Sequence, residues 1–213
     1  LGRRRQHAPR QVQDAARAAG SLIPVISFSN DRGVAKPGVF VMGIAPQTQV
    51  ERVVSSAASQ QLKRFAILYP SSAYGNAVRQ AYQDAVTQSG GQVAMMQAYD
   101  PAATDFISTL QSLQSGYKSG GFDALMIPEG GQKLSALIGM LPGFDIPSAA
   151  AGAGGVRLLG TALWNDPSLT GDPNLSGAWF ANTPPDRWAN FAQRYQSVYG
   201  APPDSRAGVI YDA

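Results

Sequence analysis

The sequence predicts an α/β fold in which parallel strands alternate with helices. Short apolar runs typical of buried strands recur along the chain, and most are separated by segments whose apolar residues repeat every three or four positions, as in amphipathic helices. This alternation favours a parallel sheet with helices on both faces, joined by right-handed crossovers. The predicted strands are residues 22–28, 39–44, 65–69, 92–98, 124–127 and 156–159.

The stretch 65–93 shows the repeating unit most clearly. A strand at 65–69 is followed by a turn at 70–75, and then by a helix that ends at Gly90-Gly91 before the next strand. In open parallel sheets, ligands bind beyond the carboxyl ends of the strands. The turn 70–75, with Tyr74 at its tip, is therefore a candidate site.

Further helices and one long connection complete the pattern. After residue 160 the chain becomes rich in Gly, Pro, Asn and Asp, with Trp164 and Trp179 embedded, and this composition predicts a long connection over 161–183 that crosses between lobes or covers a site. Thr104 and Asp105 are expected to cap the helix that they open. The predicted helices are 12–19, 46–59, 104–114, 131–141 and 186–199.

The residue inventory argues against an enzyme. The chain has no cysteine, and its single histidine, His7, lies in an arginine-rich start, so neither a thiolate site nor a catalytic triad is expected. Ser115 and Lys118 match a Ser-x-x-Lys spelling but lack its partner motif. The glycine-rich run 152–155 precedes a strand, whereas phosphate-binding loops follow one. We therefore predict no catalytic residue, no cofactor and no metal.

Charge and hydropathy argue against nucleic-acid binding and membrane spanning. The formal charge is +3, but five of the 17 basic residues are arginines within the first 17 positions, and beyond them 12 basic residues face 13 acidic ones. The basic character belongs to that leading segment, so we predict no nucleic-acid partner. No run of 18 apolar residues occurs, so no transmembrane segment is predicted.

Polar residues at other strand ends complete the candidate site. Glu129 follows the strand 124–127 and precedes a helix, which puts a carboxylate at the same sheet edge as Tyr74. A carboxylate there can pair with an ammonium group, although Glu129 can equally cap the helix while Tyr74 packs as a turn aromatic. Ser27, Ser29 and Asn30 suit a ligand carboxylate, although Ser-Asn-Asp is also ordinary turn chemistry.

Several motifs follow one another in a fixed order along the chain. They are 23–29 (IPVISFS), Phe40, Pro46 with Gln47 and Gln49, Tyr74-Gly75, Pro128-Glu129 with Gly131, and Tyr211-Asp212-Ala213. This succession resembles the type I periplasmic binding proteins of the leucine/isoleucine/valine-binding class. The stretches 160–169 (GTALWNDPSL) and 28–31 (FSND) look closer to penicillin-binding-protein activators, the LppC/LpoA-like branch of lipoproteins.

The resemblance implies two Rossmann-like lobes with parallel sheets, joined by crossing strands, with ligand held in the cleft between them. Residues 1–39 and 180–213 are then a partial first lobe, incomplete in this chain, and 40–179 are the second lobe. The crossing strands are expected at 39–44 and near 178–183. A periplasmic location, with a lipid anchor in the full-length protein, is implied as well.

The resemblance also implies two functions. Amino-acid binders of the family use hydroxyl and amide groups matching Ser27, Ser29 and Asn30, a tyrosine matching Tyr74 and an acid matching Glu129, which predicts a solute receptor that serves a membrane permease of an ABC transporter. Those binders often carry an Arg-Thr pair where this chain has Val41-Met42. This departure favours the alternative, an activator that contacts a cell-wall synthase.

Overall fold

The structure is a computed structural model that describes residues 8–20, 23–27, 34–41, 46–149, 154–182 and 185–203. The chain divides into two compact units, one formed by residues 1–45 with 183–213 and the other by residues 46–182. Their assignment to the two predicted lobes, at 1–39 with 180–213 and at 40–179, stays a prediction.

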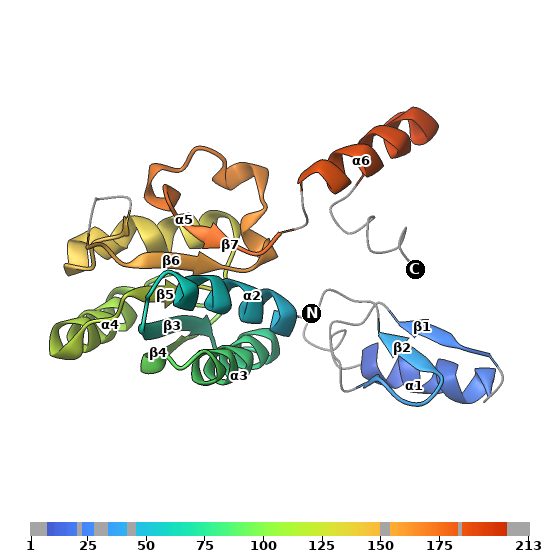
Figure 1. Cartoon of the computed structure of the whole chain (residues 1–213), viewed down its shortest axis with the longest axis horizontal. Helices are drawn as coiled ribbons and strands as arrows, with labels where there is room; N and C mark the ends of the chain where they lie inside the picture. The colour runs from blue at the N-terminus through green and yellow to red at the C-terminus, as the bar shows by residue number, and fades with distance from the viewer. Residues whose placement is uncertain are drawn as a thin grey trace. The chain divides into compact units, whose positions relative to one another are not determined.

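The second unit is built on a five-stranded parallel sheet, which confirms the predicted fold class (Figure 1). In space the strands follow the order β4-β3-β5-β6-β7, so β3 lies between β4 and β5 although it precedes both in the chain. The bounds are β3 (Arg64–Pro70), β4 (Gln92–Tyr99), β5 (Ala124–Met126), β6 (Arg157–Gly160) and β7 (Trp179–Phe180).

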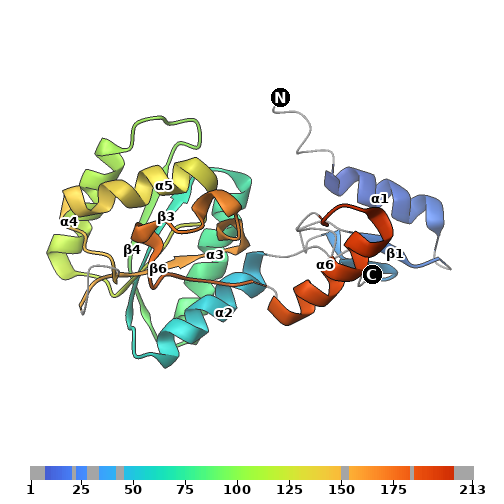
Figure 2. The same ribbon diagram turned by 90° about the horizontal axis from the view of Figure 1, so that it is seen from above.

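Helices cover both faces of this sheet, with α2 (Pro46–Ser59) and α3 (Ala73–Gln88) on one face and α4 (Ile107–Gly120) and α5 (Gly131–Met140) on the other (Figures 1 and 2). Successive residues of β3 alternate between the two cores. Phe65 and Ile67 pack with α2 and α3, whereas Ala66 and Leu68 pack with α4 and α5. This period of two explains why the strand is apolar throughout.

Helix α3 begins earlier than predicted. The hydroxyl of Ser72 accepts a hydrogen bond from the amide of Gly75 and caps the helix, which starts at Ala73. Tyr74 therefore lies in the first helical turn, not at the tip of a turn. Gly75 is required there, because a Cβ atom would lie 1.9 Å from the carbonyl oxygen of Pro70.

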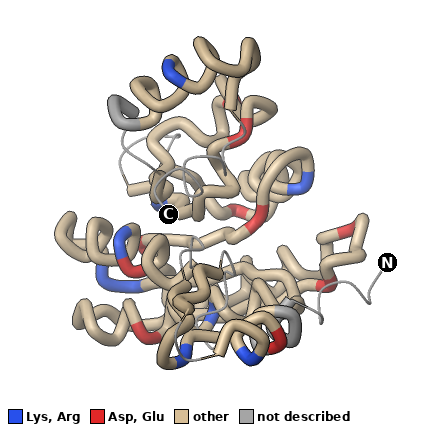
Figure 3. The backbone as a smooth tube through the Cα atoms, turned by 90° about the vertical axis from the view of Figure 1, so that its right-hand side faces the viewer, with Lys and Arg blue, Asp and Glu red and all other residues tan. Residues whose placement is uncertain are grey.

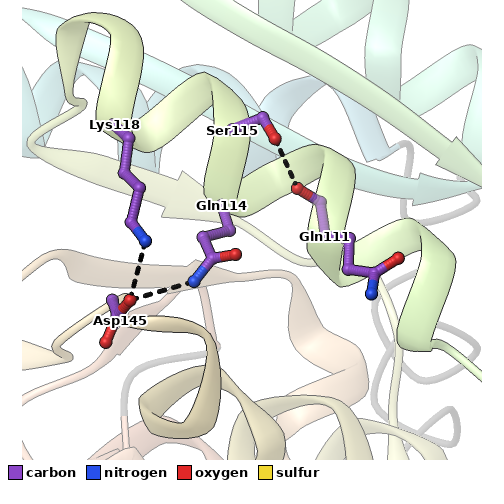
Figure 4. A network of polar contacts seen from close by, with 5 residues as sticks. All are labelled: Gln111, Gln114, Ser115, Lys118 and Asp145. Carbon is purple, nitrogen blue, oxygen red and sulfur yellow. Dashed lines mark hydrogen bonds and ion pairs between the residues drawn. The ribbon is translucent and has the colours of Figure 1, made fainter.

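Helix α4 also differs from its prediction, since it starts at Ile107 and continues to Gly120. The carboxylate of Asp105 accepts a hydrogen bond from the Ile107 amide at the start of the helix, and Ile107 itself is 48% exposed. Near its other end, Lys118 forms an ion pair of 2.9 Å with Asp145, which follows the 3₁₀ turn η2 (Leu141–Phe144) (Figure 4).

The long connection after β6 is packed against the unit. It contains three 3₁₀ turns, two of them capped by the carboxylates of Asp166 and Asp172. Trp164 is buried and donates a hydrogen bond from its indole nitrogen to the carbonyl of Ile127. The turns are η4 (Ala162–Trp164), η5 (Pro167–Leu169) and η6 (Pro173–Leu175).

The first unit contains α1 (Ala8–Ala19), α6 (Pro185–Tyr199) and a two-stranded parallel sheet of β1 (Val25–Ser27) and β2 (Val39–Val41). Val25 pairs with Val39. Along α6, the aromatic rings of Trp188, Phe191, Tyr195 and Tyr199 contact one another in succession. Ile23 and Pro24, which the prediction placed in a strand over 22–28, lie before β1 and are not strand. Residues 22, 28 and 42–44 of the predicted strands lie outside the described residues, as does part of the glycine-rich run 152–155.

Charged residues are dispersed over the described parts of both units. Short segments of basic and acidic residues are scattered along the backbone, and neither sign gathers in one large region (Figure 3). Within the same described residues, no helix combines the length and the apolar character that crossing a bilayer requires.

Candidate functional site

Four polar side chains gather where the strands of the second unit end. Tyr99 is the last residue of β4, Tyr74 lies in the first turn of the helix after β3, Glu129 follows β5, and Thr161 follows β6. Because all these strands are parallel, their carboxyl ends meet at one edge of the sheet. Two hydrogen bonds join these four side chains in pairs.

The first pair is Tyr99 and Glu129. The Tyr99 hydroxyl donates a hydrogen bond of 2.5 Å to Oε2 of Glu129, while Oε1 accepts one of 3.2 Å from the Gly130 amide. Glu129 is half-buried, and the N-cap residue of α5 is Gly130, which has no side-chain cap. The carboxylate thus interacts with the backbone where α5 begins and is also held by a tyrosine from another strand.

The second pair is Tyr74 and Thr161, whose hydroxyl oxygens lie 3.0 Å apart. Thr161 is only 1% exposed, and Tyr74 is half-buried against the core between the sheet and α2 and α3. Burial raises the pKa of Tyr74, the hydrogen bond to Thr161 opposes that rise, and the negative charge of Glu129 adds to it. The carboxylate of Glu129 therefore lies within electrostatic reach of the Tyr74 hydroxyl.

Tyr99 is fixed from several sides. It is 3% exposed, and its ring packs edge-to-face on Phe106, with centroids 5.6 Å apart. Its carbonyl oxygen accepts hydrogen bonds from both the amide and the hydroxyl of Ser71, which follows β3. Burial, and then the hydrogen bond to Glu129 and its charge, raise the pKa of Tyr99, so the phenol stays protonated and acts as a donor.

The turn η4 is fixed beside this edge. The side-chain oxygen of Gln49 in α2 accepts a hydrogen bond of 2.7 Å from the Ala162 amide. Trp164 packs so closely on Gly160 that a Cβ atom there would lie 2.1 Å from the indole ring. Thr161 is thus held between two anchored residues, and it can hold the hydroxyl of Tyr74 in turn.

The predicted site residues do not all belong to the same unit. The structure brings Tyr74 and Glu129 to the same edge of one sheet. Ser27 ends β1 in the first unit, where it is buried and engaged in an interaction, and Ser29 and Asn30 lie outside the described residues. Their roles as ligand contacts stay predictions.

Sequence reasoning missed Tyr99 and Thr161. Tyr99 directly follows the predicted strand 92–98, and Thr161 lies two residues after the predicted strand 156–159, so the rule that selected Tyr74 and Glu129 could have selected them. Their partners could not be predicted, because the pairing depends on the order of the strands in space. Within the ranges that the structure describes, no group of three or more His, Cys, Asp or Glu side chains is arranged to hold a metal ion.

Solved structures share this fold across most of the chain. A solute-binding protein of an ABC transporter from R. palustris, in complex with benzoate, has a TM-score of 0.66 at 18% identity, with 94% of this chain and 55% of that chain covered. A putative branched-chain amino acid ABC transporter protein from Rhodospirillum rubrum has a TM-score of 0.70 at 16% identity, covering 89% and 54%.

A third structure, an ABC transporter substrate-binding protein from Desulfitobacterium hafniense in complex with Leu, has a TM-score of 0.65 at 18% identity and covers 96% and 58%. The chain thus spans a little over half the length of these proteins. No curated protein sequence matches it significantly. The sequence profile of the family described as periplasmic binding protein matches residues 8–213, and the chain therefore belongs to the periplasmic binding protein family.

Proposed function

We propose that this chain is part of a non-enzymatic, extracytoplasmic solute receptor that recognises a small polar ligand such as an amino acid. The observation that carries the proposal is the convergence of the Glu129 carboxylate and the Tyr74 hydroxyl at the carboxyl edge of one parallel sheet. Ligands of open α/β sheets bind at this edge.

The chemistry of this edge suits a ligand with a cationic group. An ionised carboxylate offers about four lone-pair positions, and in Glu129 two of them accept hydrogen bonds from Tyr99 and Gly130. The remaining positions can accept hydrogen bonds from a ligand ammonium group, a charge-assisted interaction. The ring of Tyr74 offers an apolar surface beside it, and its hydroxyl can hydrogen-bond to the ligand.

Family membership supports the receptor class. The structures described above include a complex with leucine and a complex with benzoate, both of ABC transporter solute-binding proteins. By analogy, a membrane permease is the expected partner and the periplasm the expected location. In this proposal Ser27, Ser29 and Asn30 contribute hydroxyl and amide groups for a ligand carboxylate.

The alternative is a penicillin-binding-protein activator that contacts a cell-wall synthase and carries a lipid anchor. It relies on the Val41-Met42 pair in place of Arg-Thr and on the sequence 160–169. The relatives named above are transporter proteins, and this favours the receptor. We keep the activator as an outcome of the test.

The test is isothermal calorimetry of the full-length protein with individual amino acids. We expect a leucine-like amino acid to bind, and Glu129→Ala to weaken that binding about tenfold or more, because the ammonium group loses its charged partner. Glu51→Ala, at an exposed position of α2, is the matched control and should leave the affinity unchanged. Absence of binding, together with capture of a penicillin-binding protein, would establish the alternative.

A further inference from the structure

We infer that Tyr99 is a positioning residue, which orients the Glu129 carboxylate toward the cationic group of the ligand. This inference rests on the proposed function, because it deepens the role of the same site. It is carried by the geometry of Tyr99, which reaches Glu129 from β4 past the end of the intervening strand β3.

Tyr99 is built to stay in place. Its ring is 3% exposed and packs edge-to-face on Phe106, and its carbonyl is tied to Ser71 by two hydrogen bonds of 2.8 and 3.0 Å. A residue held at both its backbone and its ring has little freedom left for its hydroxyl group. The 2.5 Å hydrogen bond therefore fixes the position of Oε2 of Glu129, rather than following it.

The second carboxylate oxygen is fixed in a different way. Oε1 of Glu129 accepts a hydrogen bond from the Gly130 amide at the start of α5. With one donor on each oxygen, the plane of the carboxylate is determined before any ligand binds, and the unused lone pairs have fixed directions. A ligand ammonium group then meets an acceptor that needs no reorganisation.

Two effects oppose each other when the Tyr99 hydroxyl is removed. The carboxylate becomes slightly more negative, which strengthens its attraction for a cation, but it also becomes free to rotate and to recruit water. We expect the loss of orientation to dominate, because hydrogen bonds to charged groups depend strongly on geometry.

The experiment compares L-leucine with 4-methylpentanoate, which has the same apolar body and carboxylate but no amino group. The ratio of the two affinities measures the preference for the amine. In Tyr99→Phe, we expect the affinity for leucine to fall about tenfold and the affinity for 4-methylpentanoate to stay unchanged, so this preference falls about tenfold. A purely structural defect would weaken both ligands equally. Isothermal calorimetry on the full-length protein provides both affinities.

Two further variants separate the possible failures. Tyr82→Phe is the matched control, because it removes a buried hydroxyl that donates to the Ala66 carbonyl away from the site, and it should not change the preference. Glu129→Gln should abolish the preference. If Glu129→Gln weakens leucine but Tyr99→Phe does not, the positioning role is wrong; if Glu129→Gln has no effect, or leucine does not bind, the proposed function and this inference both fall.

Discussion

The hydroxyl of Tyr74 lies 3.0 Å from the hydroxyl of Thr161, and 87 residues separate the two in the chain. Tyr74 follows β3 and Thr161 follows β6, and β5 lies between these strands in the sheet. The contact therefore joins two strand ends that are not neighbours. It ties together the edge of the sheet at which Glu129 also lies.

Replacing Thr161 with valine tests this contact. Valine preserves the shape but removes the hydroxyl, so the half-buried hydroxyl of Tyr74 loses its partner, and we expect the free energy of unfolding to fall by about 1–2 kcal/mol. Urea denaturation provides the measurement. Thr87→Val is the control, since Thr87 is an exposed residue of α3. If Thr161→Val lowers the free energy of unfolding no more than Thr87→Val does, the contact with Tyr74 does not contribute to stability.

Alkaline pH should destabilise the protein through its buried tyrosines. Burial raises the pKa values of Tyr82 and Tyr99 above that of a free tyrosine. Above about pH 10 the unfolded chain therefore releases protons that the folded protein retains, and the free energy of unfolding falls as the pH rises, by up to about 1.4 kcal/mol per pH unit for each group. Below that pH the full stability is present.

Denaturation at a series of alkaline pH values measures this slope. Tyr82→Phe and Tyr99→Phe should each make the slope of the free energy of unfolding against pH shallower, by the amount that corresponds to one proton. Tyr199, which is 68% exposed on α6, provides the control variant Tyr199→Phe. Equal slopes in all of these proteins would contradict the prediction.

Gly160 should not tolerate a side chain. A Cβ atom at this position would lie 2.1 Å from the ring of Trp164, so Gly160→Ala forces the indole to move and should cost about 1–3 kcal/mol. Gly139→Ala is the opposite case, because nothing lies within 4 Å of its Cβ position in α5, and it should stabilise by about 0.5–1 kcal/mol. Thermal unfolding of both variants distinguishes a packing effect from a general effect of alanine.

The ion pair between Lys118 and Asp145 should influence titration more than stability (Figure 4). The hydrogen bond and charge of Lys118 lower the pKa of Asp145. The contribution of the ion pair to stability is therefore present above the pKa that Asp145 has in the unfolded chain, and it is lost as the pH falls through the pKa of Asp145 in the folded protein. In Lys118→Ala we expect the pKa of Asp145 to rise, as NMR of the carboxyl carbon would show. Lys133→Ala, whose ammonium group donates to Pro101 instead, should leave it unchanged.

Much of the second unit was predictable because its signals are local. Each buried strand is a short apolar run and each helix shows a repeat of three to four residues, so α2 was predicted with its observed bounds and β3 to within one residue. The start of α3 was predicted too late. Its cap at Ser72 depends on a hydrogen bond that the helical pattern does not reveal.

The sequence by itself determined the α/β class and placed Tyr74 and Glu129 near the carboxyl ends of strands, since both conclusions depend on the periodicity of neighbouring residues. Only the tertiary structure decided how the side chains at this edge pair. Strand β3 inserts between β4 and β5. In this arrangement Tyr99 forms a hydrogen bond with Glu129, and Tyr74 forms one with Thr161. Periodicity carries no information about which strands become neighbours, because that choice depends on how whole helices and strands pack together.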